Sequence, residues 1–307
     1  MADLPLAERI LRASCGDRVR AGFPLAPLTT FRIGGPAALY LEPEDEGDLR
    51  AAARAVAEAG VAWTVLGKGS NVLVADEGFP GLVLRLGGGF RWAERDGDRL
   101  TVGGAMPLPA LAGVASRHAL QGVEFGIAIP ATVGGAVRMN AGAHGGEVGD
   151  VVETVDLFLL EQEGRATIAA ADAGFAYRTS ALPADAVVIG ARFALRAGDP
   201  LLIRAKMDEA REWRRRTQPL AEPNCGSVFT NPPGTHAARL IEDAGGKELA
   251  EGRAHVSRKH ANFIIADPGA TARDVLRLIE RIRARVRDRA GVELSTEVRL
   301  VGGPAHG

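Results

Sequence analysis

The chain has 307 residues, of which 46% are hydrophobic and 24% charged, and its formal net charge is −1. This composition is typical of a globular protein, and the near-neutral charge gives no overall field for binding nucleic acid. The two cysteines, Cys15 and Cys225, form neither a disulfide framework nor a metal-ligand spacing, so we expect a reducing, cytoplasmic setting and no metal. The N-terminus lacks the pattern of a signal peptide, and no apolar run has membrane-spanning length, so we expect no membrane insertion.

Apolar periodicity, glycines and capping residues predict short helices and strands in irregular order. Helices are predicted at residues 45–60, 107–118, 201–217, 235–244 and 271–290, and strands at residues 61–66, 72–74, 81–86, 151–160, 187–195, 262–265 and 292–301. Residues 122–149 are predicted to be a long glycine-rich loop region. Because the strands and helices do not alternate regularly, we expect an α+β protein with mixed sheets and a domain boundary near residue 199.

Two glycine-rich segments are candidates for binding phosphate. Residues 66–71, Leu-Gly-Lys-Gly-Ser-Asn, follow a predicted strand, and glycines there let backbone N–H groups converge on one anion. The segment matches neither the nucleoside-triphosphate loop nor the dinucleotide fingerprint, and a hairpin or bulge loop is an equal alternative. Residues 126–146 form the second segment, whose regular apolar residues argue against a flexible surface loop. Two such segments suggest one long ligand with a central diphosphate.

Residues 222–232, Glu-Pro-Asn-Cys-Gly-Ser-Val-Phe-Thr-Asn-Pro, place a hydroxyl, a thiol and two amides around a tight turn beside a short apolar strand. A scaffold turn does not need Ser227 held between Gly226 and Val228. A reaction that delivers one proton to one face of a substrate does. The segment therefore predicts a catalytic site, although Ser227 as a simple turn cap is the alternative.

Several motifs together resemble the UDP-N-acetylenolpyruvoylglucosamine reductase (MurB) family. They are, in chain order, Thr30-Phe31-Arg32-Ile33-Gly34-Gly35, residues 66–76, residues 129–146, Tyr177-Arg178-Thr179-Ser180, residues 223–232, His260-Ala261-Asn262-Phe263-Ile264 and Glu297-Val298-Arg299. The spacing between the tyrosine–arginine pair and Ser227 resembles the shorter form of the family, which lacks an extra substrate loop. The departures include the run at 128–131, Arg138, His144 and the segment at 246–248.

The resemblance implies an FAD-binding fold of the vanillyl-alcohol-oxidase (PCMH) type, with a smaller C-terminal α+β substrate domain. We expect residues 1–199 to be the FAD-binding region, in two subdomains split near residue 80, and residues 200–307 to be the substrate-binding domain. The family is an FAD-dependent oxidoreductase, UDP-N-acetylmuramate dehydrogenase, that uses NADPH in peptidoglycan synthesis. The FAD is non-covalent. The residues implied to bind it are Gly67, Lys68, Gly69, Ser70, Asn71, Pro130, Ala131, Thr132, Gly134, Gly135, Asn140 and Gly142.

Three residues are implied to be catalytic. Arg178 would hold the substrate carboxylate, since a guanidinium fork matches it bidentately. Ser227 would donate a proton, and Cys225 is a rival because a thiol is more acidic. Glu297 would lie near the same carboxylate, protonated and with a raised pKa. Without the resemblance, the alternative for Arg178 is a surface ion pair, as for most arginines of the chain. Sequence alone would leave Glu297 as a solvated residue at a strand edge.

Substrate binding is assigned by position in or beside the matching motifs. These residues are Tyr177, Arg214, Gln218 and Asn231. A basic helix end that complements the helix dipole is the alternative for most of the arginines at 214–216. The rival functions are another flavin oxidoreductase of the same fold and a non-catalytic flavin-binding protein. We expect a monomer whose partners are the sugar nucleotide and NADPH.

Overall fold

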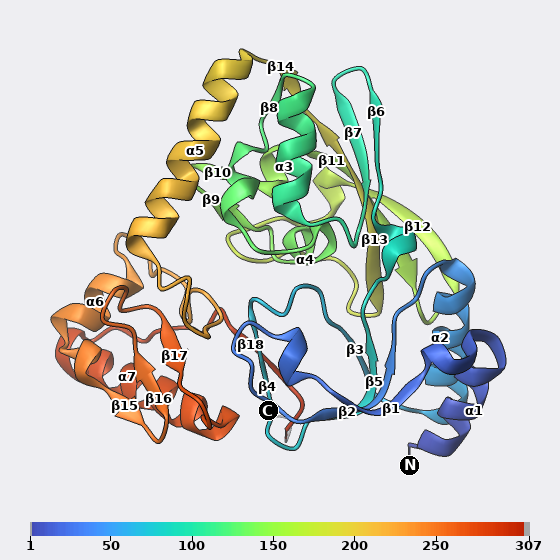
Figure 1. The fold of residues 1–307 in the computed structure, drawn as a ribbon, viewed down its shortest axis with the longest axis horizontal. Helices are drawn as coiled ribbons and strands as arrows, with labels where there is room; N and C mark the ends of the chain where they lie inside the picture. Colours follow the sequence, from blue (N-terminus) through green and yellow to red (C-terminus); the bar gives the residue numbers. More distant parts are fainter. Residues whose placement is uncertain (1, 304–307) are drawn as a thin grey trace. The chain divides into compact units, whose positions relative to one another are not determined.

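The computed structural model describes residues 2–303, which fall into two units that each draw on several chain segments (Figure 1). Of the described residues, unit 1 contains 2–21, 39–68 and 81–214, and unit 2 contains 22–38, 69–80 and 215–303. The chain thus passes between the units five times. None of the helices within residues 2–303 is long and apolar enough to cross a membrane.

Unit 1 contains most of the secondary structure. Its elements are α1 (Leu4–Cys15), α2 (Glu46–Ala59), β3 (Trp63–Val65), β6 (Ala93–Asp96), β7 (Arg99–Gly103), α3 (Leu108–Arg117), β8 (Leu120–Gln121), α4 (Val133–Arg138), β9 (Gly142–Ala143), β10 (Gly146–Glu147), β11 (Val152–Leu159), β12 (Gly164–Ala169), β13 (Ala186–Ala194) and β14 (Arg196–Ala197). Four of the five crossings between the units lie in β1 (Arg20–Pro24), β2 (Pro36–Leu41), β5 (Phe79–Leu84) and α5 (Pro200–Thr217), and the fifth lies between residues 68 and 69. One sheet has the order β1-β2-β5-β3, and the other has the order β12-β11-β13-β7-β6.

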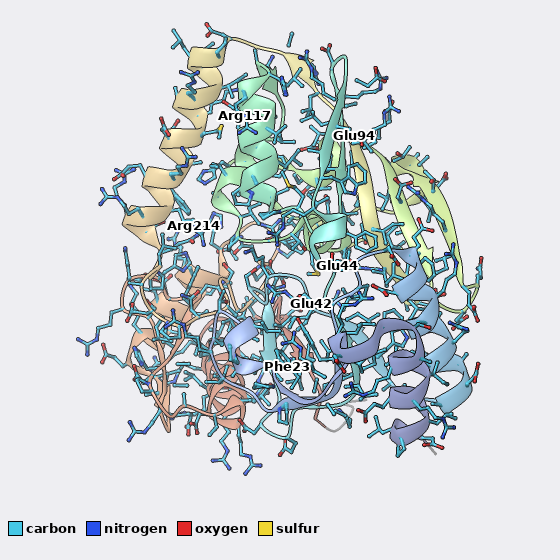
Figure 2. The ribbon with its side chains drawn as sticks, turned by 45° about the vertical axis from the view of Figure 1, so that its right-hand side comes forward. Phe23, Glu42, Glu44, Glu94, Arg117 and Arg214 are labelled. Atoms are coloured by element: carbon cyan, nitrogen blue, oxygen red, sulfur yellow. The ribbon has the colours of Figure 1, made fainter. Side chains whose placement is uncertain are left out.

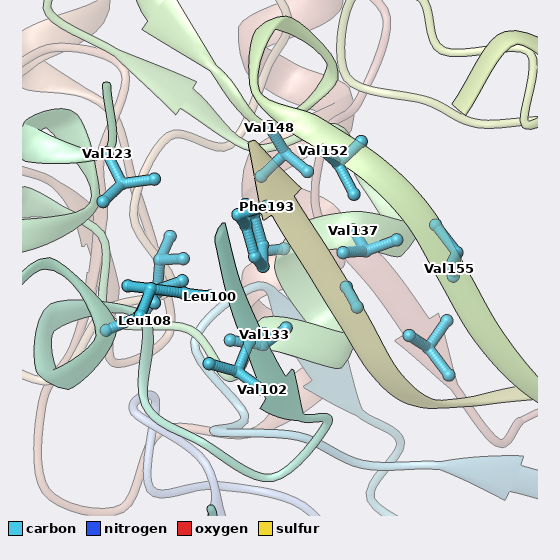
Figure 3. Packing of buried hydrophobic residues seen from close by; sticks show 14 of the residues in the cluster. Leu100, Val102, Leu108, Val123, Val133, Val137, Val148, Val152, Val155 and Phe193 are labelled. Carbon is cyan, nitrogen blue, oxygen red and sulfur yellow. The ribbon is translucent and has the colours of Figure 1, made fainter. Parts of the chain in front are cut away.

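Strand β13 is buried on both faces and separates two apolar cores. Val188 and Ala191 pack in the first core, and Val187 and Ile189 pack in the second. Successive side chains of a strand point to opposite faces of its sheet, so a strand covered on both sides becomes a continuous apolar run. This explains why residues 187–195 were predicted as a strand without polar alternation. Figure 3 shows the first core, where Phe193 of β13 lies among residues of β7, β11, α3 and α4.

The second core is covered by α1 and α2. Helix α2 begins at Asp45, whose carboxylate accepts a hydrogen bond from the Asp48 N–H (3.0 Å), and ends at Gly60 with φ of 60°. Asp is favoured at the start of a helix because its carboxylate accepts from the free N–H groups there. Gly is favoured at the end because it adopts the left-handed conformation without strain. Five buried alanines in α2 allow close packing of the two helices.

Unit 2 contains its own apolar core. Its elements are β4 (Val72–Val74), α6 (Ala237–Asp243), β15 (Ala250–Glu251), β16 (Ala254–Val256), β17 (Ile264–Ala266), α7 (Ala272–Ala290) and β18 (Arg299–Val301). The antiparallel sheet β15-β16-β17 packs with α7, whose buried residues recur at helical spacing. Helix α7 begins with a capping box of Thr271 and Asp274. Strand β18 pairs in parallel with β4, which joins residues 299–301 to residues 72–74.

The five predicted helices are confirmed to within two residues at each end. Three predictions were wrong or incomplete. Residues 122–149 are not simply loop, because α4 and the β9–β10 pair lie within them. Residues 292–301 form a strand only at β18, and the strand predicted from residue 262 begins at Ile264. Helix α1 was missed, although Asp3 caps it and Ala7, Leu11 and Cys15 repeat every four residues on its buried face.

Candidate active site

A cavity of about 710 Å³, including its opening to solvent, lies within unit 1. It is lined by Val65, Leu66, Gly67, Lys68, Arg85, Leu86, Arg91, Gly104, Ala105, Thr132, Gly134, Gly135, Arg138, Ala186, Val187 and Val188. Both predicted phosphate-binding segments contribute to it, through Gly67 and Lys68 and through Thr132, Gly134 and Gly135.

Four glycines line the cavity, and three of them have little or no room for a side chain. A Cβ atom added to Gly104 would lie 2.2 Å from the carbonyl oxygen of Val188, and one added to Gly67 would lie 2.8 Å from Thr132 Oγ1. At Gly134 the nearest atom would be the carbonyl oxygen of Val188, at 3.0 Å. Any side chain at these positions would collide with neighbouring protein atoms, and the half-buried Gly67 and Gly134 leave main chain open to a ligand.

The charged residues that line the cavity are all basic: Lys68, Arg85, Arg91 and Arg138. Arg138 is committed to the protein, since its guanidinium donates to the carbonyl oxygens of Leu182 (3.0 Å), Pro183 (2.9 Å) and Ala186. Within residues 2–303, the side chains of Lys68 and Arg91 have no hydrogen bond or ion pair. Cations without a counter-ion, on a wall of exposed backbone, fit an anionic ligand such as a diphosphate.

Several predicted cofactor residues lie outside the cavity lining. Pro130, Ala131, Asn140 and Gly142 belong to unit 1 but do not line it, and Gly69, Ser70 and Asn71 belong to unit 2. Their contacts with FAD remain predictions. The sequence did not predict the lining residues Arg85, Leu86, Arg91, Gly104, Ala105 and 186–188. The only local signal for any of them is the pair Gly103-Gly104 at the end of β7.

Tyr177 and Arg178 form the tip of a tight turn in unit 1. Ala176 and Thr179 exchange backbone hydrogen bonds of 3.1 Å across it, and Arg178 has a φ of 58°. A non-glycine residue in this left-handed region costs roughly 1–2 kcal/mol, and such outliers cluster at functional sites. The guanidinium lies 4.8 Å from the centroid of the Tyr177 ring, and its Nη2 donates to the carbonyl oxygen of Gly142 (2.9 Å). Arg178 is therefore held in one direction.

In unit 2, Ser227 and Glu297 lie on neighbouring, hydrogen-bonded segments. The carbonyl oxygen of Val228 accepts hydrogen bonds from the N–H of Glu297 (2.8 Å) and of Val298 (3.3 Å). A β-bridge between Phe229 and Thr296 continues the contact. The two predicted catalytic residues, distant in sequence, are thus brought together, and both are half-buried. Arg178 belongs to the other unit.

The Ser227 turn is fixed on its N-terminal side by Asn224. The Asn224 side chain accepts from the Gly226 N–H (2.9 Å) and donates to the carbonyl oxygens of Pro219 (3.0 Å) and Glu222 (2.7 Å). Gly226 has a φ of 79°, which explains the glycine before the serine. Burial raises the pKa of the Cys225 thiol above its ordinary value. Cys225 is thus a weaker acid than an exposed cysteine.

The predicted substrate residues have varied surroundings. Arg214 lies near the C-terminal end of α5 (Figure 2), and burial lowers the pKa of its guanidinium. A partly desolvated cation favours an anionic partner. Asn231 Oδ1 accepts from the Ala237 N–H (3.0 Å) and so caps α6. Tyr177 is exposed. In the part of the chain that is described, no three His, Cys, Asp or Glu side chains gather to form a metal site.

Comparison with known proteins defines the class first. Residues 37–167 match the model of an FAD-binding domain, a range that includes most of the cavity wall. With its α+β architecture, the protein is a flavoprotein with an FAD-binding domain of the vanillyl-alcohol-oxidase (PCMH) type and a distinct C-terminal domain. The BBE-like 1 protein of Physcomitrella patens, 12% identical with a TM-score of 0.55, covers 92% of this chain and 88% of its own, and it supports the fold alone.

The particular family follows from closer relatives. Residues 218–301 match the model of the UDP-N-acetylenolpyruvoylglucosamine reductase C-terminal domain. Enzymes of that name from Heliobacterium modesticaldum and an Anaeromyxobacter species are 48% and 50% identical, over 91% and 95% of this chain and 89% and 92% of theirs. The crystal structure of the Thermus caldophilus enzyme is 36% identical with a TM-score of 0.81, covering 92% of this chain and 100% of its own. The chain belongs to the UDP-N-acetylenolpyruvoylglucosamine reductase family, and its length is consistent with the shorter form.

Proposed function

We propose that the chain is an FAD-dependent UDP-N-acetylmuramate dehydrogenase. It reduces the enolpyruvyl ether of UDP-N-acetylglucosamine with NADPH, which gives UDP-N-acetylmuramate for peptidoglycan synthesis. Besides family membership, one observation carries the proposal: the hydrogen bond from the Glu297 N–H to the Val228 carbonyl oxygen joins the segment that carries the acid to the segment that carries the Ser227 hydroxyl. A hydroxyl and a carboxyl on adjacent segments suit a proton transfer at a carbon next to a carboxylate.

The cavity of unit 1 fits the diphosphate of FAD. Gly67, Gly134 and Gly135 expose backbone, and Lys68 and Arg91 supply unpaired positive charge. We place the further contacts at Gly69, Ser70, Asn71, Pro130, Ala131, Thr132 and Gly142, in an FAD-binding region of residues 1–199 with residues 200–307 binding substrate. When bound, FAD supplies the hydride chemistry, which passes hydride from NADPH to the terminal carbon of the enolpyruvyl double bond.

Arg178 stabilises the negative charge that the reaction places on the substrate carboxylate. The enolpyruvyl group is an electron-rich enol ether, so it accepts hydride only if charge can flow onto the carboxylate oxygens. A guanidinium held by Tyr177 and Gly142 is preorganised for that charge. Glu297, in its protonated form, donates a second hydrogen bond to the same group.

Ser227 then gives its proton to the carbon next to the carboxylate, and solvent restores the hydroxyl. Serine is a weak acid, so it serves only where the acceptor is strongly basic and closely placed, and an enolate meets the first condition. The turn at Gly226 and the hydrogen bonds of Val228 meet the second, because they fix the backbone on both sides of the serine.

Tyr177, Arg214, Gln218 and Asn231 bind the sugar nucleotide in this proposal. Arg214 is the best of them for the diphosphate, since it is partly desolvated and stands at a helix end. We place the enzyme in the cytoplasm, where NADPH and sugar nucleotides are available, and we expect it to act as a monomer.

The test is a substrate-dependent oxidation of NADPH, followed by its absorbance with the enolpyruvyl sugar nucleotide as acceptor. We expect yellow protein that NADPH bleaches once per flavin, and continuous turnover only after the substrate is added. Turnover with oxygen alone would instead favour an oxidase of the same fold. Protein that retains FAD but is not reduced by NADPH would favour a non-catalytic flavin-binding protein.

A further inference from the structure

We infer that Asn140 is a positioning residue for Arg178: its buried side-chain amide fixes the turn that presents the guanidinium. The inference rests on the proposed function, because it assigns Asn140 a part in carboxylate binding. It also gives Asn140 a role other than cofactor contact, since the Asn140 side chain does not line the unit 1 cavity.

The Asn140 side chain uses its donors and its acceptor inside the protein. Nδ2 donates to the carbonyl oxygen of Ala176 (3.0 Å) and to Glu147 Oε1 (2.8 Å), and Oδ1 accepts from the Gly149 N–H (2.8 Å). The residue is 0% exposed. A carbonyl and a carboxylate accept while an N–H donates, so these partners define which end of the amide points where.

Ala176 is the residue immediately before Tyr177 and Arg178, and it closes their turn by exchanging hydrogen bonds with Thr179. The bond from Asn140 therefore holds the base of the turn, while the bond from Arg178 to Gly142 holds its tip. Both anchors come from residues 140–142, a single short segment. The position of the guanidinium thus depends on that segment at two points.

The turn needs such support because its backbone is strained. Arg178 has a φ of 58° and Asn140 has a φ of 42°, both in the left-handed region. A strained conformation persists only where surrounding contacts determine it. Without the Ala176 bond, Arg178 could relax to an ordinary backbone conformation, which would turn the guanidinium away from its present direction.

Glu147 completes the arrangement and allows a sharp test. Its carboxylate faces Nδ2 of Asn140, so Asn140→Asp would set two carboxylates together and would also remove the donor to Ala176. A second change, Glu147→Gln, restores a donor toward the carboxylate introduced at position 140 and removes the repulsion. It leaves the Ala176 carbonyl without the Asn140 donor, so that only the Thr179 N–H still donates to it. The double variant therefore tests the loss of the bond to Ala176 without the destabilising pair of carboxylates.

We would measure four quantities for each variant: the melting temperature, FAD content, the rate of flavin bleaching by NADPH, and kcat with the enolpyruvyl substrate. Asn140→Asp should lower kcat by about tenfold or more while FAD content and bleaching stay near wild type. Asn140→Asp/Glu147→Gln should regain the melting temperature but keep the low kcat. Val155→Ala, at a fully buried side chain of the same unit, controls for general destabilisation and should retain kcat.

A double-mutant cycle with Arg178→Lys shows whether Asn140 acts through Arg178. If it does, Asn140→Asp costs less than about twofold in kcat in the Arg178→Lys background. The inference is overturned if the two losses simply multiply, if kcat recovers together with stability in the Glu147→Gln double variant, or if bleaching and FAD content fall in proportion to kcat. A wild-type chain that does not reduce this substrate would count against the proposed function instead.

Discussion

The side-chain amide of Asn71 donates a hydrogen bond to the backbone carbonyl oxygen of Glu297, 3.1 Å from Nδ2, although 226 residues separate the two in sequence. The Arg299 N–H in turn donates to the Asn71 carbonyl oxygen (3.1 Å). Asn71 therefore holds the segment that carries Glu297 at two points, within unit 2. A residue predicted from a phosphate-binding motif thus also supports a predicted catalytic acid.

We predict that Asn71→Ala lowers kcat with the enolpyruvyl substrate about five- to tenfold, because one lost hydrogen bond is worth about 1 kcal/mol and the Glu297 segment loses an anchor. Steady-state NADPH oxidation measures the effect. Thr230→Val is the matched control, since Thr230 Oγ1 donates to the Ser295 carbonyl oxygen (3.2 Å) in the same segment. Equal losses in both variants, or a loss explained by missing FAD, would count against the role given to Asn71.

Ser227→Ala should abolish substrate reduction and leave bleaching of the flavin by NADPH unchanged, because only the second half-reaction uses the serine proton. Rapid mixing of the reduced enzyme with the enolpyruvyl substrate measures that half-reaction directly. If Ser227→Ala reoxidises at the wild-type rate, another group donates the proton.

Cys225→Ala is the control for the rival donor. Burial raises the pKa of Cys225, so its thiol stays protonated through the neutral pH range and is a poor proton donor. The variant should keep the wild-type rate of reoxidation. A loss confined to Cys225→Ala would identify the thiol as the acid.

Much of the fold could be predicted because local chemistry agrees with the final structure. Asp45 and Gly60 mark the ends of α2, and Thr271 and Gly291 mark those of α7. Helix α4 was hidden because glycines at positions 134 and 135 oppose helix formation, yet a Cβ at Gly134 would approach two carbonyl oxygens. Tertiary packing therefore determines that α4 is helical, and the helix propensities of its residues do not predict it.

The sequence predicted which kinds of residue form the candidate site, but it did not predict the hydrogen bonds that join them. Glycine-rich segments and a serine that follows a turn can be recognised from the local sequence. The bond from Asn140 to Ala176 and the pairing of Asn262 with Phe229 join residues 36 and 33 positions apart, and nothing in either local sequence points to the partner. Basic cavity residues such as Arg91 were missed for the same reason, since arginines are frequent in this chain.

Asn262→Ala should lower the free energy of unfolding by about 2–4 kcal/mol, because it leaves two buried backbone groups unpaired. Asn262 is 4% exposed, its Oδ1 accepts from the Phe229 N–H (2.9 Å), and its Nδ2 donates to the Phe229 carbonyl oxygen (2.8 Å). Denaturant unfolding with FAD in excess measures the loss. We also expect a lower kcat, since Phe229 continues the segment that carries Ser227.

Ser257→Ala is the control for that measurement. Ser257 is 2% exposed in the same unit, and its Oγ accepts a single bond, from the Lys259 N–H (3.2 Å). Its loss should be about 1 kcal/mol, with kcat unchanged. Equal stability losses in the two variants would mean that the paired bonds of Asn262 have no special weight.

Asp48 should make the stability of unit 1 depend on acid pH. Burial alone would raise its pKa, but hydrogen bonds from the Arg18 fork, the Glu44 N–H (2.8 Å) and the Cys15 thiol (3.3 Å) lower it overall. A carboxyl whose pKa is lower in the folded state contributes its full stability above the unfolded value of about 4 and loses it as pH falls through the folded value.

We therefore predict that Asp48→Asn costs about 2 kcal/mol of unfolding free energy at pH 7, since it removes the charge that the half-exposed Arg18 fork binds. The difference from wild type should shrink as pH falls below about 4, where the wild-type carboxyl takes up its proton. Asp17→Asn, at a fully exposed carboxylate nearby, should show no such pH dependence. Urea unfolding at a series of pH values measures both, and a constant difference between Asp48→Asn and wild type down to pH about 2 would show that the Asp48 charge does not contribute.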